Sequence, residues 1–246
     1  MKILLTADLH YTLKQLDWLS ATAPRFDVVI IAGDLLDIVS IVDLETQIVV
    51  VMKYLRRMCP ETRLVVSSGN HDLNAKNADG EQFARWLRRV RELGVPTDGD
   101  SWEHDGTLFT ICPWWDGEVE KAKVAEQLRR DAALGKRPWV WVYHAPPVST
   151  EVSWDGKRDF GDVALREWIE LYQPDLVLGG HIHQAPFANG GDWIDQIGKT
   201  WIINSGKQIG PVPTFTVIDT EAGTAEWLSL AGRERLEFET GEKVEL

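Results

Sequence analysis

Two histidines stand one residue apart in the stretch LGGHIHQ, which runs from Leu178 to Gln184. In an extended chain, residues i and i+2 point to the same face, whereas on a helix the same spacing places them on nearly opposite sides. At the end of a strand, His181 and His183 could therefore bind the same ligand. An isolated H-x-H pair is more often part of a polar surface turn, so the rest of the chain has to decide between the two interpretations.

Groups able to bind metal or move a proton follow five short hydrophobic runs, and five of the six histidines lie there. The runs are KILLTAD (Lys2 to Asp8), VVIIAGD (Val28 to Asp34), LVVSSGN (Leu64 to Asn70), WVWVYHA (Trp139 to Ala145) and DLVLGGH (Asp175 to His181). The groups are Asp8, His10, Asp34, Asn70, His71, His144, His181 and His183. Because the carboxyl ends of neighbouring strands converge in open α/β sheets, this placement favours one shared site.

Segments with apolar residues at helical spacing separate these runs, and the alternation predicts parallel strands joined by helices. The expected helices are Ser40 to Met58, Glu81 to Leu93, Gly117 to Leu134 and Asp162 to Leu171. Leu108 to Trp114 could be a further strand. After His183, the segments Thr200 to Gly206, Phe215 to Asp219 and Ala225 to Leu230 predict antiparallel strands without a helix, and the charged tail from Arg233 could form a last strand or fray. We find no repeat or linker and expect a single domain over residues 1–246.

The composition limits the partners and the compartment. The chain has 246 residues, 44% hydrophobic content, a formal net charge of -12 and a pI near 5.0. This acidity argues against a general affinity for nucleic acid or for anionic membranes. Cys59 and Cys112 lie too far apart in sequence to suggest a disulfide framework or a zinc ribbon. The N-terminus lacks the apolar run of a signal peptide and no stretch approaches a membrane span, so we expect a cytoplasmic protein and leave its oligomeric state open.

The donor set at the strand ends indicates which ions it could bind. It comprises two carboxylates, one amide oxygen and four imidazoles, with His71 left over. This exceeds the need of one tetrahedral ion, and the absence of thiolates argues against a structural zinc site. The set suits two divalent metal ions of the Mn, Fe or Zn kind.

The motifs DLH, GDLLD, GNHD, HAPP and GGHIH, in this order, resemble the complete motif set of the calcineurin-like metallophosphoesterases. The resemblance runs from Asp8 to His183. It implies an α/β fold built as a four-layer αββα sandwich, with two mixed β-sheets flanked by helices. It also implies a hydrolase that cleaves phosphoester bonds by attack of a metal-bound hydroxide, with two ions about 3.5–4 Å apart.

The same resemblance assigns a role to each residue at the centre. Asp8, His10 and His183 would bind one metal, Asn70, His144 and His181 would bind the other, and Asp34 would bridge the two. Mn²⁺ is the favoured ion. His71 would bind no metal but would lie near the substrate and stabilise or protonate the leaving oxygen.

Three acidic or basic residues near these motifs are harder to assign. We expect Asp72 to hydrogen-bond and orient His71, because imidazoles at working sites usually have such a partner, although Asp72 could equally cap the following turn. For Asp37 we favour a structural role at the start of the next helix over a role beside the site. His104 lies in a polar segment without a motif, and we expect it at the surface.

Departures from the family pattern bear on the substrate. Protein serine/threonine phosphatases extend the second motif to GDxxDRG, whereas GDLLD continues here as IVSI, without an arginine for a phosphate. A dianionic monoester gains most from an arginine clamp, so we favour a phosphodiesterase acting on a small or nucleotide-like phosphoester. The alternatives are a phosphomonoesterase or nucleotide pyrophosphatase, and a non-catalytic metal-binding scaffold, an interpretation opposed by the retention of every motif residue.

Two loops are candidates for the substrate pocket. CPWWDG (Cys112 to Gly117) and VSTEVSWDGKRD (Val148 to Asp159) carry three tryptophans and two basic residues. The tryptophans Trp114, Trp115 and Trp154 could stack on a base or an aryl leaving group, but packing under their own loops is the more frequent use of such residues. The segment NSGK (Asn204 to Lys207) is a further candidate for substrate contact.

Overall fold

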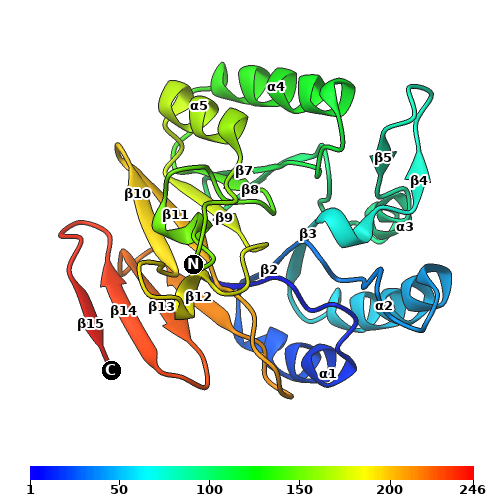
Figure 1. Cartoon of the computed structure of the whole chain (residues 1–246), viewed down its shortest axis with the longest axis horizontal. Coiled ribbons are helices and arrows are strands. Elements are labelled where there is room, and N and C mark those ends of the chain that lie inside the picture. The colour runs from blue at the N-terminus through cyan, green and yellow to red at the C-terminus, as the bar shows by residue number, and fades with distance from the viewer.

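The computed structural model describes residues 1–246 and has four layers, with two face-to-face sheets in the middle and helices on both outer faces (Figure 1). The larger sheet has the strand order β15-β14-β13-β12-β1-β2-β3, and the smaller has the order β10-β11-β9-β8-β7-β6. A two-stranded hairpin, β4-β5, lies apart from them. The four-layer sandwich of two mixed sheets predicted from the sequence is confirmed.

The larger sheet contains β1 (Lys2–Thr6), β2 (Val28–Ala32), β3 (Arg63–Ser67), β12 (Phe215–Asp219), β13 (Thr224–Leu228), β14 (Arg233–Glu237) and β15 (Lys243–Glu245). The smaller sheet contains β6 (Ser101–His104), β7 (Thr107–Ile111), β8 (Trp139–Val142), β9 (Leu176–Gly179), β10 (Ile194–Ile197) and β11 (Thr200–Asn204). β1, β2 and β3 are mutually parallel, as are β7, β8, β9 and β11, while β12 to β15 continue the larger sheet antiparallel from β1. The predicted parallel pairing of the five runs is therefore confirmed within each sheet. The prediction of an antiparallel strand in Thr200 to Gly206 is wrong for one of its two neighbours, since β11 is antiparallel to β10 but parallel to β9.

The helices are α1 (Leu13–Thr22), α2 (Leu44–Met58), α3 (Leu87–Arg91), α4 (Glu118–Ala132) and α5 (Val163–Tyr172), with short 3-10 turns η1 (Ala23–Arg25), η2 (Asn70–Asp72), η3 (Glu151–Ser153) and η4 (Ala185–Phe187). In Figure 1, α4 and α5 cover the smaller sheet, and α1 and α2 cover the larger one. None of these helices combines the length and the apolar character that a membrane crossing requires.

Three clusters of buried hydrophobic side chains lie between the four layers of helices and sheets and hold them together. Because side chains alternate along a strand, Leu4 and Val29 face α1 and α2, whereas Ile3 and Ile30 face the smaller sheet. These residues belong to clusters of 22 and 21 buried residues, and a third cluster of 14 lies between the smaller sheet and its helices. Burial on both faces explains why the strands read as near-continuous hydrophobic runs.

The predicted helix from Glu81 to Leu93 is wrong over its first half. There the chain forms the hairpin of β4 (Ala75–Lys76) and β5 (Gln82–Phe83), and only Leu87–Arg91 is helical. The Glu81 carboxylate accepts hydrogen bonds from the backbone N–H groups of Val119 and Glu120, both at 2.8 Å, in the first turn of α4. This tertiary capping contact holds the segment extended despite its helical spacing.

Other elements differ from the sequence expectation at their ends or were not predicted. α2 begins at Leu44 and not at Ser40, because the Asp43 side chain caps it by accepting the Thr46 N–H at 2.9 Å. α1, β6 and β10 were not predicted, and α1 has no side-chain cap at Thr12 to mark its start. His104, which was expected at the surface, is only partly exposed: it ends β6 and stacks on Trp102 with ring centroids 4.8 Å apart.

Candidate metal centre

The loops that leave β1, β2, β3, β8 and β9 meet at one edge of the two sheets and carry all the predicted site residues. Backbone hydrogen bonds tie the first two loops together: the N–H of Asp8 donates to the Gly33 carbonyl at 3.1 Å, and that of His10 donates to the Asp34 carbonyl at 2.9 Å. The N–H of His181 donates to Asp8 Oδ2 at 3.0 Å. Residues from both sheets are thus fixed around Asp8.

The backbone at this edge is strained in a way that turns side chains inward. Asp8, His10, Asp34 and His181 have φ values of 56°, 40°, 53° and 73°, in the left-handed region that L-residues rarely occupy. Such conformations cost of order 1–3 kcal/mol each and are typical of functional sites. The chain therefore turns sharply just after these strands.

Two glycines allow the side chains to approach each other closely. A Cβ atom at Gly33, whose φ is +91°, would lie 2.4 Å from His144 Nδ1, and one at Gly69 would lie 2.2 Å from Asp34 Oδ1. Neither contact is possible between non-bonded atoms. The glycines of GDLLD and GNHD are therefore needed for the packing of the centre.

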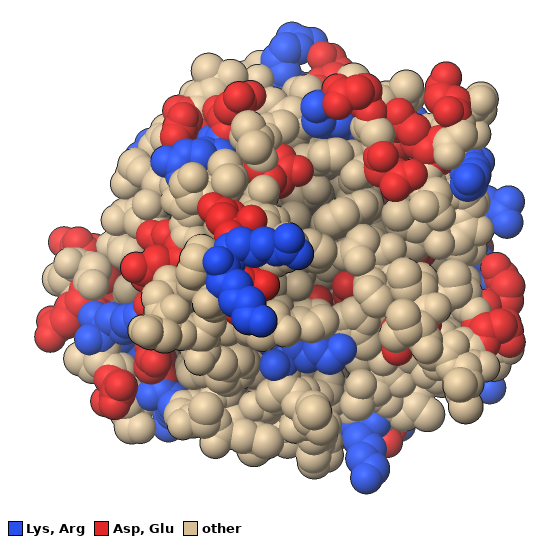
Figure 2. Space-filling view, in the orientation of Figure 1, with Lys and Arg blue, Asp and Glu red and all other residues tan.

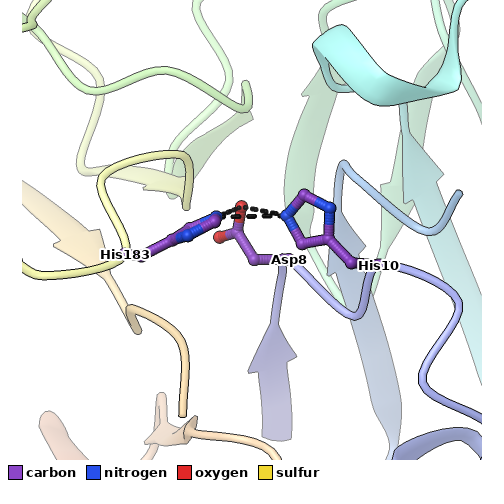
Figure 3. Close-up of side chains that lie close together, drawn as sticks. All are labelled: Asp8, His10 and His183. Atoms are coloured by element: carbon purple, nitrogen blue, oxygen red, sulfur yellow. Dashed lines mark hydrogen bonds and ion pairs between the residues drawn. The ribbon is translucent and has the colours of Figure 1, made fainter. Parts of the chain in front are cut away.

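Asp8, His10 and His183 form one group of possible metal ligands (Figure 3). His183 Nε2 lies 3.1 Å from Asp8 Oδ1, and His10 Nε2 lies 3.7 Å from the same oxygen. The two imidazole nitrogens are 3.1 Å apart. The structure thus brings together the three residues that were predicted to share one metal.

Asp34 lies between this group and His144. Asp34 Oδ2 is 3.6 Å from His10 Nε2 and 3.2 Å from His144 Nε2, and the latter atom is 3.8 Å from Asp8 Oδ1. Asp8, Asp34 and His144 are all buried and form a second group that could hold an ion. The Asp34 carboxylate therefore adjoins both groups of possible ligands.

One buried polar atom at the centre lacks a partner that a metal could supply. Asn70 Oδ1 is buried and makes no hydrogen bond, although buried polar atoms almost always have one. An imidazole nitrogen at the base of the centre, His144 Nε2, forms an ion pair with Asp34 Oδ2, 3.2 Å away. His144 Nδ1 donates to the Ala32 carbonyl at 2.7 Å, which directs Nε2 toward the carboxylates. His181 lies beside His144, with ring centroids 5.2 Å apart. These residues fit divalent cations bound by oxygen and imidazole ligands.

The protonation states of the metal-free centre also indicate a site for cations. Burial lowers the pKa of His144, but the charges of Asp34 and Asp8 outweigh it and raise the pKa to about 10. Burial, together with the charge of His144, lowers the pKa of His181 to about 4. Without a cation, a proton on His144 compensates the two carboxylates, so a divalent ion bound by His144 has to displace that proton.

The neighbour of the His71 ring is Asp37 and not Asp72. His71 Nδ1 lies 3.4 Å from Asp37 Oδ1, and the His71 backbone N–H donates to Asp34 Oδ1 at 2.8 Å. The prediction that Asp72 orients His71 is wrong. Asp37, for which a structural role was favoured, has both kinds of contact, since its Oδ1 also accepts the Val39 N–H at 3.1 Å. Because His71 also lies within reach of His10 and Asp34 in a third possible metal group, the structure leaves both a ligand and a non-ligand role open for it.

The Asp72 carboxylate instead holds backbone at the base of the centre. Its two oxygens accept hydrogen bonds from the N–H groups of Asp34 at 2.7 Å, Leu36 at 3.0 Å and Gly69 at 2.8 Å. Burial and the charge of Asp34 raise the pKa of Asp72 to about 8 in spite of these bonds. Asp72 therefore acts through the backbone of the second and third loops and not through an imidazole.

Replacing Asp72 with alanine should destabilise the protein by at least about 3 kcal/mol, because three buried N–H donors would lose their acceptor at once. Urea unfolding of the metal-free protein measures this free energy directly. Asp79→Ala is the matched control, since Asp79 is exposed in the turn between β4 and β5. A similar loss for both variants would contradict the role given to Asp72.

The tryptophans of the two predicted pocket loops differ in position. The Trp114 ring lies 5.2 Å from that of His181 and 5.8 Å from that of His144, and its backbone N–H donates to Ser68 Oγ at 2.9 Å. Trp115 stacks on Tyr143 with centroids 4.1 Å apart. Trp154 donates its indole N–H to the Asn189 carbonyl at 3.1 Å. Trp114 therefore borders the centre, whereas Trp115 and Trp154 make packing contacts away from it.

Two mixed sheets, with buried carboxylates and imidazoles converging at the carboxyl ends of their strands, define an α/β protein with a candidate metal centre between its loops. A family model described as calcineurin-like phosphoesterase matches residues 1–185. The chain belongs to this family, and phosphoester hydrolysis with divalent metal ions is its family chemistry. No curated protein matches the chain.

Solved structures share the fold at low sequence identity. A Thermus thermophilus protein, TT1561, has a TM-score of 0.60 and 14% identity, with 100% of this chain and 97% of that one covered. A dimetal phosphatase from Danio rerio has a TM-score of 0.58 and 10% identity, with coverage of 92% and 95%. A purple acid phosphatase, PPD1, from yellow lupin (Lupinus luteus) seeds has a TM-score of 0.56 and 11% identity, with coverage of 100% and 52%. At these identities the likeness concerns the fold alone.

Proposed function

We propose that this phosphoesterase is a dinuclear, Mn²⁺-dependent phosphodiesterase acting on a small or nucleotide-like phosphoester. The observation that carries the dinuclear centre is the buried, unpartnered Asn70 Oδ1, together with the Asp34 carboxylate that lies 3.2 Å from His144 Nε2 and 3.6 Å from His10 Nε2. Asp8, His10 and His183 would hold one ion, and Asn70, His144 and His181 would hold the other. Bound divalent ions would neutralise phosphoryl oxygens and lower the pKa of water at the site.

The protein's own residues would complete the site around the substrate. His71 lies with its ring 4.4 Å from that of His10, near enough to the centre to meet the leaving oxygen of a bound ester. Asp37 Oδ1 and the Ile38 N–H, each 3.4 Å from His71 Nδ1, would hold that ring in place. Trp114 would form one wall of the site and limit the access of water.

The preference for a diester is supported by the absence of an arginine from the centre. No arginine forms an ion pair or a side-chain hydrogen bond with Asp8, Asp34, Asp37 or the site histidines. A dianionic monoester gains most from the two parallel bonds of a guanidinium, whereas a monoanionic diester needs less compensation. The metal ions would supply most of the charge that a diester requires.

The proposal includes one domain and a cytoplasmic location. β12 pairs with β1, so the C-terminal strands complete the sheet that the N-terminal strand begins, which supports one domain over residues 1–246. Cys59 and Cys112 are free thiols, and unpaired cysteines are typical of a reducing compartment.

The first test compares a diester with a monoester on one protein preparation. The protein is stripped of metal, Mn²⁺ is restored, and initial rates are measured on bis(p-nitrophenyl) phosphate and p-nitrophenyl phosphate. We expect faster turnover of the diester and its loss on addition of a chelator. Faster turnover of the monoester would make the protein a phosphomonoesterase, and bound metal without turnover of either substrate would favour a scaffold.

A further inference from the structure

Lys207 is a half-buried cation without an ion pair, and its backbone is hydrogen-bonded to that of His183, one of the predicted metal ligands. It follows β11 in the segment NSGK and takes part in none of the protein's salt bridges. An ammonium group that is partly removed from water without a partner is costly, and such groups often mark a binding site for an anion.

The backbone around Lys207 is held against the predicted ligand loops. The Lys207 N–H donates to the His183 carbonyl at 3.1 Å. The Asn204 side chain accepts the Gly206 N–H at 2.9 Å and donates to the Ile182 carbonyl at 3.0 Å. On the other side, the Gln15 side chain donates to the Gln208 carbonyl at 3.0 Å. The backbone at Lys207 is thus fixed between the GGHIH loop and α1, as in a preformed site.

The charge balance shows why the partner of Lys207 should come from outside the chain. With two divalent cations bound, Asp8 and Asp34 would be more than neutralised, and they would no longer attract the ammonium group. Asp37 lies beside His71. An anion at the centre would then be the nearest compensating charge. The face of the molecule drawn in Figure 2 has a hollow near its middle, with basic side chains along the edge of the hollow and acidic atoms at its bottom.

We propose that the ammonium group of Lys207 binds a phosphoryl oxygen of the substrate and helps to determine which phosphoester the protein accepts. This inference rests on the proposed phosphoester hydrolysis and adds a residue that recognises the substrate from the protein side. A lysine supplies one charge and no planar fork. Lys207 thereby favours a monoanionic diester at the site over a dianionic monoester, which would leave one charge less well compensated.

The test uses the full chain loaded with Mn²⁺ and the variants Lys207→Met and Lys207→Arg. Lys199→Met is the matched control, because Lys199 is exposed in the turn between β10 and β11. Isothermal titration with inorganic phosphate gives a Kd that does not depend on turnover, and kinetics on bis(p-nitrophenyl) phosphate give kcat and KM separately. The Mn²⁺ content of each variant is measured on the same samples.

For Lys207→Met we expect Kd for phosphate and KM for the diester to rise about tenfold to a hundredfold, the loss typical of a hydrogen bond to a charged group. We expect a smaller change in kcat, substantial recovery in Lys207→Arg and no change in Lys199→Met. Unchanged phosphate affinity in Lys207→Met would overturn the proposal, as would loss of Mn²⁺ from that variant alone. If the wild-type protein turned over no phosphoester, the proposed function would fail, but phosphate binding would still test Lys207.

Discussion

Replacing Asp34 with asparagine should lower the affinity for Mn²⁺ by roughly a hundredfold or more, since even residues that only support metal ligands are worth 10–100-fold. Asp34 Oδ2 lies 3.6 Å from His10 Nε2 and 3.2 Å from His144 Nε2, so the carboxylate adjoins both predicted metal positions. Asparagine has nearly the same shape, and its oxygen can still accept the His71 N–H that Asp34 Oδ1 accepts at 2.8 Å. The expected loss is therefore caused by the missing charge, and diester turnover should fall with it.

The measurement is the Mn²⁺ content per chain after gel filtration, taken together with the rate on bis(p-nitrophenyl) phosphate. Asp43→Asn is a suitable control because Asp43 caps α2 through its side chain, and asparagine caps a helix equally well. The control should keep both its metal content and its rate. Full metal occupancy in Asp34→Asn would show that this carboxylate does not bridge the two ions.

The fold was predictable from the sequence where local pattern and tertiary packing agree. Strands buried on both faces must be apolar throughout, so β1, β2, β3, β8 and β9 stand out as hydrophobic runs. The segment from Glu81 was mispredicted because contacts distant in sequence determine its shape: the Glu81 side chain caps α4, and the Gln82 N–H donates to Asp116 Oδ2 at 2.9 Å. Spacing within one segment cannot reveal such contacts.

The candidate site was predictable to the level of residue type and strand end, but the supporting contacts were not. Asp72 directly follows His71 in sequence, which suggested a contact between their side chains, yet the turn η2 directs the Asp72 carboxylate to the backbone of Asp34 and Gly69. The residue beside His71 is Asp37, from the preceding loop. The only signal for Asp37 in the sequence was its place in GDLLD. How close its loop lies to the loop of His71 depends on how the strands are arranged in the sheet. Lys207 was noted only as part of NSGK, since its burial without an ion pair is a property of the folded chain.

Replacing His71 with alanine should leave both metals bound and lower diester turnover by about 10²–10⁴-fold, the range typical of a residue that transfers a proton in catalysis. His71 Nδ1 faces Asp37 at 3.4 Å, which leaves Nε2 as the nitrogen available to a leaving oxygen. Burial lowers the pKa of His71, while the charges of Asp34 and Asp37 oppose the shift. A lowered pKa makes the protonated ring a better proton donor, so the rate of the wild-type protein should fall as the pH rises and His71 loses its proton.

The metal content of His71→Ala decides between the two roles that the geometry allows. His71, His10 and Asp34 could together hold an ion, in which case alanine would release metal as Asp34→Asn is expected to do. Equal metal loss in the two variants would therefore make His71 a ligand and remove it as the proton donor. Asp37→Asn adds an independent measurement: if Asp37 holds the ring through Nδ1, this variant should keep both metals and show a smaller loss of turnover than His71→Ala, because the imidazole itself remains.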